Sequence, residues 1–364
     1  MKAFELEEYL SNGVEKIVTG ILKASVRNPK ESIFMMQYVL DSKKARHIRK
    51  EHEEKGEHIP PFLIASITTQ CNLHCKGCYA RANHHCHDLS IGDDEMLPTN
   101  KWGAIFQEAE ELGIGFILLA GGEPFLRIDV LKEAAKYKKI LFPVFTNGIL
   151  LGEAVDELLD KNRNLIPVLS IEGDEATTDS RRGSGTYKKL ISSMDKLKSH
   201  GIIFAASVTV TRENMNETVS HDFVQKLAQE GCKGIIYVEY VPVDAATSNQ
   251  ALEDDDRVQM LEKLDDLRKV RDDMVLIAFP GDEKSSGGCL AAGRGFFHIN
   301  AHGGAEPCPF SPYSDVNLKN MSIKEALKSP LFLKLKENGN LENDHIGGCT
   351  LFGQEEEVRK LLEI

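Results

Sequence analysis

The sequence predicts an α/β protein built on a partial (β/α)6 barrel of the TIM type, with helices before the barrel and a small cysteine-rich domain after it. From residue 62 onward, short apolar runs alternate six times with helical patterns, which is typical of parallel strands with helices outside them. Residues 1–58 have a helical, polar-rich pattern, and residues 285–350 are rich in Gly, Pro and Cys. Since six repeats are too few to close an eight-stranded barrel, we expect the barrel to stay open.

The N-terminal extension, residues 1–58, is predicted to contain two helices. Asn28 and Pro29 form a plausible cap and first-turn pair for the second helix. We expect this extension to pack against the barrel, with a partner- or membrane-facing amphipathic helix as the alternative. The apolar residues that recur at helical spacing in the first helix are Leu6, Leu10, Val14, Ile17, Val18, Ile21 and Leu22. Those that the second helix is expected to bury are Ile33, Phe34, Tyr38 and Leu40.

The barrel is expected to span residues 59–245. A bridging helical segment follows at 246–284, and the cysteine-rich domain with a terminal helix occupies 285–364. The six strands are expected at 63–69, 115–120, 140–146, 165–171, 202–210 and 234–241.

Charge and composition narrow the classes of function. The formal net charge of −12 argues against a nucleic-acid-binding protein, which normally presents a basic face. The first residues include Glu5, Glu7 and Glu8, unlike a secretory signal, and no run of 18 apolar residues occurs. We therefore expect a cytoplasmic protein, whose eight cysteines serve as thiols or ligands rather than disulfides.

Unusual residues follow five of the predicted strands. The first strand is followed by CxxxCxxC, the second by "AGGEPF", and the third by "TNG". The fourth ends in "SIEGD" and the fifth in "TVTREN". Because functional groups of parallel βα proteins gather at the carboxyl ends of the strands, these segments are expected to form one site.

Cys71, Cys75 and Cys78 follow the first strand within eight residues. Thiolates suit zinc or an iron–sulfur cluster, and either site would be closed by four ligands. Three cysteines leave one iron of a cube free for a substrate or cofactor. The alternative is a structural zinc site completed by a nearby histidine, for which the candidates are His74, His84, His85 and His87.

The other strand ends offer groups for a charged ligand. Glu123, fixed by Pro124, offers an acceptor to an ammonium group, and the preceding glycines let a ligand approach bare backbone. Ser170 and Glu172 point to the same side of a strand and are placed to hold a ribose diol. Arg182, in "SRRGSGTY", is suited to pair with a carboxylate.

With "CNLHCKGCYA", "GGEP", "TNG", "SIEG" and "RRGSGTY" in this order, residues 62–245 resemble the radical S-adenosylmethionine (SAM) enzymes. The resemblance implies a [4Fe–4S] cluster whose free iron binds SAM. It implies reductive cleavage of SAM to a 5′-deoxyadenosyl radical, which takes a hydrogen atom from the substrate. It also implies sensitivity to oxygen and a flavodoxin- or ferredoxin-like electron donor.

Carried over by position, the resemblance makes Cys71, Cys75 and Cys78 the catalytic cluster ligands. Gly77 departs from the family, since many members have an aromatic residue there, and Tyr79 is the residue expected to cover the adenine. Arg181 is the alternative to Arg182 for the SAM carboxylate. The residues expected to bind SAM are Tyr79, Gly121, Gly122, Glu123, Pro124, Asn147, Ser170, Glu172 and Arg182.

Three further cysteines lie near the C-terminus. Cys289 and Cys308 are nineteen residues apart with Gly303 between them, and Cys349 follows in "IGGCTLFG". The alternation in "FFHIN", followed by Gly-Gly, predicts a small hairpin. This segment is similar to the Twitch form of the SPASM domain, which implies one auxiliary [4Fe–4S] cluster on these cysteines. A trio of buried reduced thiols, or a zinc site, is the alternative.

The sequence is therefore interpreted as a radical SAM enzyme acting on a small molecule or a peptide. One alternative is a maturase or epimerase of ribosomal peptides in which Cys86 donates a hydrogen atom. A second is a non-catalytic zinc or iron–sulfur scaffold, and a third is a SAM-binding accessory protein that delivers a cluster. Helices without a hairpin at the N-terminus favour a substrate without a leader peptide. Cys232 is expected to be a buried thiol far from the site.

Overall fold

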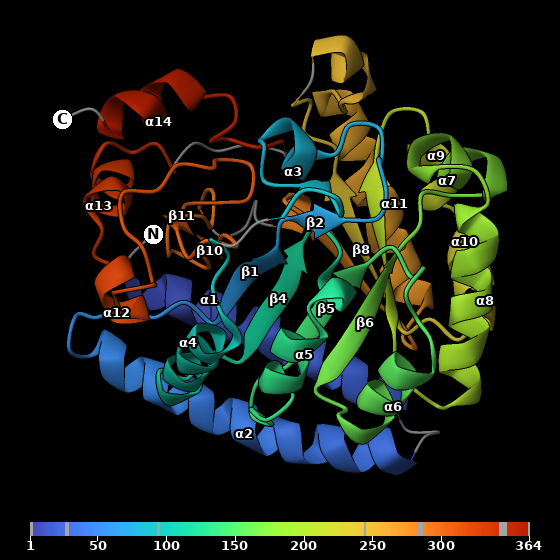
Figure 1. Ribbon diagram of the computed structural model, residues 1–364, viewed down its shortest axis with the longest axis horizontal. Helices are drawn as coiled ribbons and strands as arrows, with labels where there is room; N and C mark the ends of the chain where they lie inside the picture. The colour runs from blue at the N-terminus through green and yellow to red at the C-terminus, as the bar shows by residue number, and fades with distance from the viewer. Residues whose placement is uncertain are drawn as a thin grey trace.

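The computed structural model describes residues 3–25, 29–92, 95–243, 245–282, 287–341 and 348–362. Its centre is one nine-stranded sheet in the order β11-β10-β1-β4-β5-β6-β7-β8-β9 (Figure 1). Neighbouring strands from β10 to β9 run parallel, and only β10 and β11 are antiparallel. The strands are β1 (Phe62–Thr68), β4 (Phe116–Gly121), β5 (Phe142–Thr146), β6 (Leu165–Ser170), β7 (Ala205–Val210), β8 (Gly234–Glu239), β9 (Val275–Phe279), β10 (His298–Ile299) and β11 (Ala305–Glu306).

The partial barrel predicted from the sequence is confirmed, and all six predicted strands form, with ends that differ by a few residues. The expectation that 246–284 is a helical bridge is wrong in part, because β9 lies within it and pairs with β8. The predicted C-terminal hairpin is present as β10 and β11, but β10 also joins the barrel sheet beside β1.

The sheet curls, so that Phe296, just before β10, contacts rings on two strands that are far apart in the sheet order, β1 and β9. The ring of Phe296 lies 5.1 Å from that of Phe62 on β1 and 5.8 Å from that of Phe279 on β9. Since side chains alternate along a strand, the residues two and four positions after Phe62 on β1, Ile64 and Ser66, also face this lumen. In β4, Ala120 lies opposite Ser66, is partly exposed and faces the lumen.

Helices cover the outside of the sheet, with α4, α5 and α6 on the near side in Figure 1. Their pattern is amphipathic, and their apolar residues belong to the same core as the outward-facing strand residues. The helices of the barrel and the bridge are α4 (Thr99–Glu111), α5 (Ile128–Ala134), α6 (Glu153–Lys161), α7 (Glu175–Arg182), α8 (Thr186–Ser199), α9 (Met215–Thr218), α10 (His221–Gln229) and α11 (Asp254–Val270). The C-terminal helices are α12 (Ile323–Ala326), α13 (Pro330–Glu337) and α14 (Glu355–Leu362).

The two N-terminal helices, α1 (Ala3–Ser25) and α2 (Pro29–Glu53), close the end of the barrel where the strands begin (Figure 1). Tyr38 is buried and donates to the carbonyl of Gly115 at 2.6 Å, just before β4. Arg163, which precedes β6, pairs with buried Glu31 of α2 at 2.6 Å. This end of the barrel is therefore covered, and ligands have to enter from the other end.

One detail of the N-terminal prediction is wrong. Ile33 and Leu40, expected to be buried, are 71% and 55% exposed, because α2 turns Met35 and Tyr38 toward the barrel, and of these two only Tyr38 was expected to be buried. Pro29 begins α2 as expected, while Asn28 lies outside the described residues. Within the described ranges, none of the helices is both long enough and apolar enough to cross a membrane.

Candidate active site

The CxxxCxxC segment forms a loop directly after β1. Cys71 lies in the short strand β2 (Gln70–Cys71), which pairs with β3 (His87–Asp88), and Cys78 precedes α3 (Tyr79–Ala82). All three cysteines of the segment are partly exposed and free of disulfides. Gly77 has a φ of 63°, a left-handed conformation that lets the loop turn between Cys75 and Cys78.

Two thiols of the site are in direct contact. Cys86, which follows α3, is buried and hydrogen-bonded to the sulfur of Cys71. This bond and the backbone N–H of Leu73, 3.5 Å from the same sulfur, lower the pKa of Cys71 to about 6. Burial has the opposite effect on Cys75, whose pKa is raised. Cys71 is therefore more ready than Cys75 to act as a thiolate ligand.

The glycine loop after β4 packs on the cysteine loop. The N–H of Gly122 donates to the carbonyl of Thr68 at 2.9 Å, and that of Glu123 donates to the carbonyl of Gln70 at 2.8 Å. A Cβ atom on Gly122 would lie 2.0 Å from the oxygen of Gln70, so only glycine fits. The two glycines are thus required by the contact between two loops of the chain itself.

Glu123 anchors this loop rather than facing outward. One carboxylate oxygen accepts from the N–H of Phe125 (3.1 Å) and the hydroxyl of Thr146 (2.8 Å), and the other accepts from the N–H of Asn147 (2.9 Å). Burial raises the pKa of Glu123 to about 7, although these hydrogen bonds act in the opposite direction. Asn147 in turn donates to the side chain of Asn72 at 2.8 Å, which joins the third strand end to the cysteine loop.

Glu172 and Arg182 lie together against the same loop. Glu172 is fully buried and pairs with both Arg181 and Arg182 at 2.5 Å, while its second oxygen accepts from the N–H of Thr209. A guanidinium nitrogen of Arg182 lies 4.0 Å from the sulfur of Cys75. A ribose at Glu172 would therefore have to replace one of these contacts.

Ser170 ends β6 beside Ser207 of β7, on the lumen side of the sheet, where it is partly exposed. Pro124 begins the short 3₁₀ turn Pro124–Leu126 that follows the glycine loop. The strand-end residues predicted to bind SAM are thus gathered at one end of the barrel, around the cysteine loop.

Tyr79 points toward the C-terminal segment. Its ring packs edge-to-face on that of Phe310 with centroids 4.9 Å apart. Burial raises the pKa of Tyr79, and the nearby Cys78, Cys308 and Glu306 raise it further. Tyr79 therefore lies between the two groups of cysteines.

The residue beside Gly77 is Tyr240, which the sequence gave no reason to single out. A Cβ atom on Gly77 would lie 2.5 Å from the hydroxyl oxygen of Tyr240 and 2.8 Å from its ring. Tyr240 follows β8, is buried, and shares a 2.5 Å hydrogen bond with the hydroxyl of Thr247. The space that a side chain at position 77 would occupy is filled from another strand.

The second group of cysteines also comes together. Cys308 is hydrogen-bonded to Cys349 and lies close to Cys289, and none of the three is in a disulfide. Burial raises the pKa of Cys308, while the bond from Cys308 lowers that of Cys349. Two segments far apart in the sequence therefore bring their thiols to one place.

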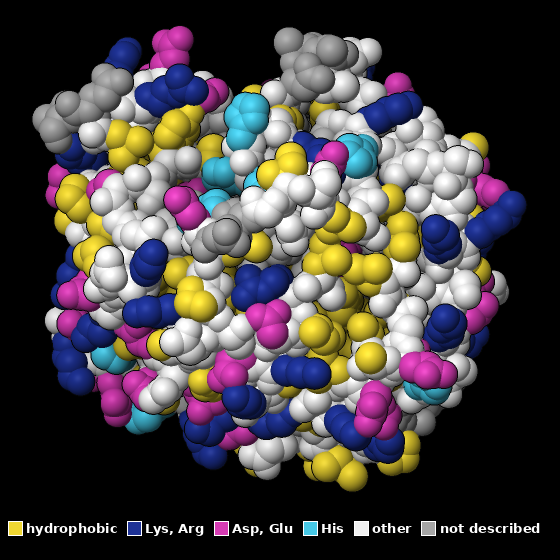
Figure 2. All heavy atoms as spheres, in the orientation of Figure 1, with side chains coloured by type: hydrophobic (Ala, Val, Ile, Leu, Met, Phe, Trp, Pro, Cys, Tyr) yellow, Lys and Arg dark blue, Asp and Glu magenta, His cyan; other side chains and the backbone are white. Residues whose placement is uncertain are grey.

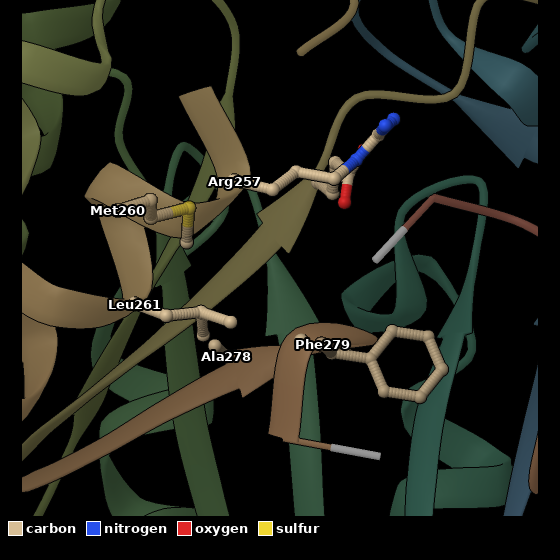
Figure 3. Close-up of a pocket in the computed structure, with 7 residues that line it drawn as sticks. Arg257, Met260, Leu261, Ala278 and Phe279 are labelled. Atoms are coloured by element: carbon tan, nitrogen blue, oxygen red, sulfur yellow. The ribbon is translucent and has the colours of Figure 1, made fainter. Parts of the chain in front are cut away.

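A small pocket lies between α11 and the ends of β8 and β9 (Figure 3). At its edge, Arg257 pairs with Glu239 at 2.6 Å, and Glu239 also accepts from the N–H of Gly348 at 2.8 Å. This pair ties the loop of Cys349 to the barrel. The lining residues are Glu239, Arg257, Met260, Leu261, Ala278, Phe279 and Gly281, and they include none of the cysteines.

Histidines gather around α3, on the upper part of the face shown in Figure 2. His74 pairs with Asp88 at 2.6 Å, and His85 lies 3.9 Å from buried Glu306. Among the described residues, no three His, Cys, Asp or Glu side chains are arranged to hold a single metal ion. Four ligands around one zinc, each at about 2.3 Å, would need such an arrangement, whereas a cube of four irons spreads its ligands apart.

Comparison with known proteins agrees with this arrangement of loops. The Radical SAM superfamily model matches residues 65–223, which hold the cysteine loop, the glycine loop and Arg182. Over this segment the chain is similar to the Radical SAM superfamily. The cofactors implied by this similarity are a [4Fe–4S] cluster and SAM, and the all-thiol donor set after β1 suits such a cluster.

Among curated relatives, the chain is 25% identical to Fe-coproporphyrin III synthase of Methanosarcina barkeri, over 56% of this chain and 48% of that protein. It is 29% identical to the sporulation killing factor maturation protein SkfB of Bacillus subtilis, over 48% of this chain and 41% of SkfB. The chain thus matches less than half the length of these two relatives.

The structure of SuiB from Streptococcus suis superimposes with a TM-score of 0.65 at 16% identity, covering 85% of this chain and 73% of SuiB. At this identity the likeness concerns the fold, and it extends well beyond the segment 65–223 into the C-terminal part of the chain.

Proposed function

We propose that the chain is a radical SAM enzyme whose Cys71, Cys75 and Cys78 hold the [4Fe–4S] cluster that binds SAM. The observation that carries this proposal is the docking of the glycine loop on the cysteine loop through Thr68 and Gln70. When bound, the cluster and SAM supply a 5′-deoxyadenosyl radical that removes a hydrogen atom from the substrate.

The chain's own residues position SAM. Glu123 holds the glycine loop, so that the backbone of Gly121 and Gly122 faces the methionine end of SAM beside the cluster. Arg182, next to Cys75, offsets the negative charge of the thiolates and pairs with the SAM carboxylate. Ser170, Glu172 and Asn147 lie around the nucleoside.

We propose that Tyr240 covers the adenine instead of Tyr79. The ring of Tyr240 lies against Gly77, where many members of the family have an aromatic residue, while Tyr79 packs on Phe310. The hydrogen-donor role of Cys86 stays a prediction, and its thiol is directed to Cys71.

We also propose a second cluster on Cys289, Cys308 and Cys349, in a C-terminal domain of the Twitch type. It is supported by the convergence of three buried or half-buried thiols and by the pair Glu239–Arg257 that fixes the loop of Cys349. The substrate is a small molecule or a peptide held in the barrel lumen. The proposal includes a cytoplasmic location and a flavodoxin- or ferredoxin-like electron donor.

Cleavage of SAM tests the enzyme proposal. Anaerobic protein with a chemical reductant and SAM is expected to yield 5′-deoxyadenosine and methionine in equal amounts. Cys78→Ala should abolish both products, because the cluster loses a ligand. Cys232→Ala is the matched control, since that thiol is buried at the opposite end of β8 and donates to the carbonyl of Gly234. Intact turnover by Cys78→Ala, or a zinc-loaded wild type without iron, would contradict the proposal.

A further inference from the structure

A buried chain of three polar side chains lies outside the site described above. The hydroxyl oxygen of Ser66 lies 2.8 Å from Nε2 of His298, and Nδ1 of His298 lies 2.7 Å from a carboxylate oxygen of Glu306. The other oxygen of Glu306 accepts from the side-chain amide of Asn300 at 2.6 Å. Ser66, His298 and Glu306 are all at least nine-tenths buried.

The partners of His298 define its hydrogen bonds. A carboxylate only accepts, so Nδ1 carries a proton and donates a hydrogen bond to Glu306. Nε2 is then left as an acceptor for the hydroxyl of Ser66. This is the relationship between serine, histidine and acid that lets a histidine take a proton from a hydroxyl group.

The serine end of this chain is at the lumen. Ser66 is on the face of β1 that also carries Phe62, whose ring packs on Phe296 inside the barrel. His298 pairs with Ile64 across β10 and β1. Both cysteine groups lie close by along the chain, since Ser66 is five residues before Cys71 and Glu306 is two before Cys308.

Holding the hairpin in place does not require these groups. β10 is already paired through its backbone with β1 on one side and β11 on the other. A buried imidazole–carboxylate pair adds little net stability over apolar residues of the same size. The placement of this pair at the lumen wall, close in sequence to both cysteine groups, therefore indicates a role in the reaction rather than in stability.

We propose that Ser66, His298 and Glu306 form a proton relay, in which His298 accepts, through Ser66, a proton from an O–H or N–H group of the substrate. This inference rests on the proposed function and narrows the substrate class. The carbon that loses its hydrogen atom carries a hydroxyl or amine group, and the reaction is a dehydrogenation.

The substrate carbon gives one hydrogen atom to the SAM-derived radical, and the C–H bond breaks. The neighbouring O–H or N–H bond breaks as its proton passes to Ser66 while the proton of Ser66 passes to Nε2 of His298. The second iron–sulfur cluster, which Cys289, Cys308 and Cys349 would hold, would in its oxidised form accept the remaining electron as a C=O or C=N double bond forms.

The titratable and charged groups that face His298 come from two elements. Glu306 on β11 is hydrogen-bonded to Nδ1. His85, from the segment after α3, lies 3.9 Å from Glu306, and burial and the nearby His298 lower the pKa of His85.

The test uses the reactivity of Ser66 and needs no substrate. The anaerobic, cluster-loaded protein is treated with phenylmethanesulfonyl fluoride across pH 5.5–9, and the modified peptide is identified by mass spectrometry. If His298 takes the serine proton, an O–S bond forms at Ser66 as the S–F bond breaks, and fluoride leaves. The labelling rate should rise with pH along one titration curve.

Two variants distinguish a proton relay from a purely structural role of these residues. His298→Gln should slow labelling about 100-fold, and Glu306→Gln about tenfold or more. Ser207 is an internal control, because it faces the lumen on β7 with similar burial and without a histidine partner among the described hydrogen bonds. Ser66→Ala should remove the label altogether.

Absence of labelling at Ser66 in the wild type would overturn the relay, as would labelling that His298→Gln leaves unchanged. If either variant fails to fold, the pH profile of the wild type still decides. Iron content and SAM cleavage are measured on the same samples. Their loss would contradict the proposed function, whereas the labelling result alone decides the relay.

Discussion

Tyr240 occupies the space beside Gly77, on a strand end about 160 residues away in the sequence. Aromatic stacking on a base contributes roughly 1–3 kcal/mol. We therefore predict that Tyr240→Ala weakens binding of S-adenosylhomocysteine, which is not cleaved, by about tenfold or more. Equilibrium dialysis against the anaerobic, cluster-loaded protein measures this change.

Two matched variants make the result specific. Tyr240→Phe keeps the ring and loses only the bond to Thr247, so its affinity should stay close to that of the wild type. Tyr79→Leu should also leave the affinity nearly unchanged. The assignment would be reversed if Tyr79→Leu weakened binding while Tyr240→Ala did not.

The single residues of the site were predictable from the sequence to different degrees. The cysteines and the glycine loop stand in short local motifs, and the structure brings these motifs together. The engagement of Glu123 by Thr146 and Asn147 was not predictable, because it depends on how the ends of β4 and β5 meet. The relay could not be predicted from the sequence either, since Ser66 and His298 are 232 positions apart.

At the scale of elements, Glu123 joins the loops after β4 and β5 to the cysteine loop. Its pKa is about 7 when folded, above its ordinary value of 4.5, because it is buried. Between these two pH values the folded chain binds more protons than the unfolded chain. The contribution of Glu123 to the stability therefore falls as pH rises from about 4.5 to about 7, and it is constant above that range.

We predict that Glu123→Gln removes this decline, because the amide does not titrate. The variant should also be less stable by about 1–3 kcal/mol at low pH, since its NH2 group faces the N–H of Asn147 and one donor is left without an acceptor. Thermal unfolding followed by circular dichroism at pH 5, 6, 7 and 8 measures both effects. Glu111→Gln, on the exposed end of α4, is the control and should keep the wild-type pH dependence.

An equal pH dependence in the wild type and in Glu123→Gln would show that Glu123 does not titrate in this range. A variant as stable as the wild type at pH 5 would contradict the anchoring role of its three hydrogen bonds.

The helices and strands show which element properties a sequence determines. Six strands of the barrel were predicted from the sequence because their apolar runs are long and are separated by helical patterns. β9 was missed because its run, Val275–Phe279, is short and follows an acidic helix. The periodicity of α2 predicted a helix correctly, yet tertiary contacts with Gly115 and Arg163 decide which face is buried, so Ile33 and Leu40 stay exposed.

At the scale of the whole molecule, α1 and α2 close one end of the barrel and the cysteine loops lie at the other. The C-terminal segment completes the sheet through β10 and brings Cys308 close to Tyr79. The sequence predicted a cysteine-rich domain there, but not its pairing with β1, because a two-residue strand leaves no periodic pattern. This pairing brings the site proposed for the second cluster close to the cysteine loop after β1.

The central claim, two clusters on two separate groups of cysteines, is tested most directly by iron and sulfide analysis of anaerobically purified protein. The wild type is expected to hold about eight irons, and about four after Cys71, Cys75 and Cys78 are all changed to Ala. The matched variant with Cys289, Cys308 and Cys349 changed to Ala should also keep about four. A fall to nearly no iron in the first variant would contradict the proposal of a second cluster. Zinc without iron in the wild type would contradict both clusters.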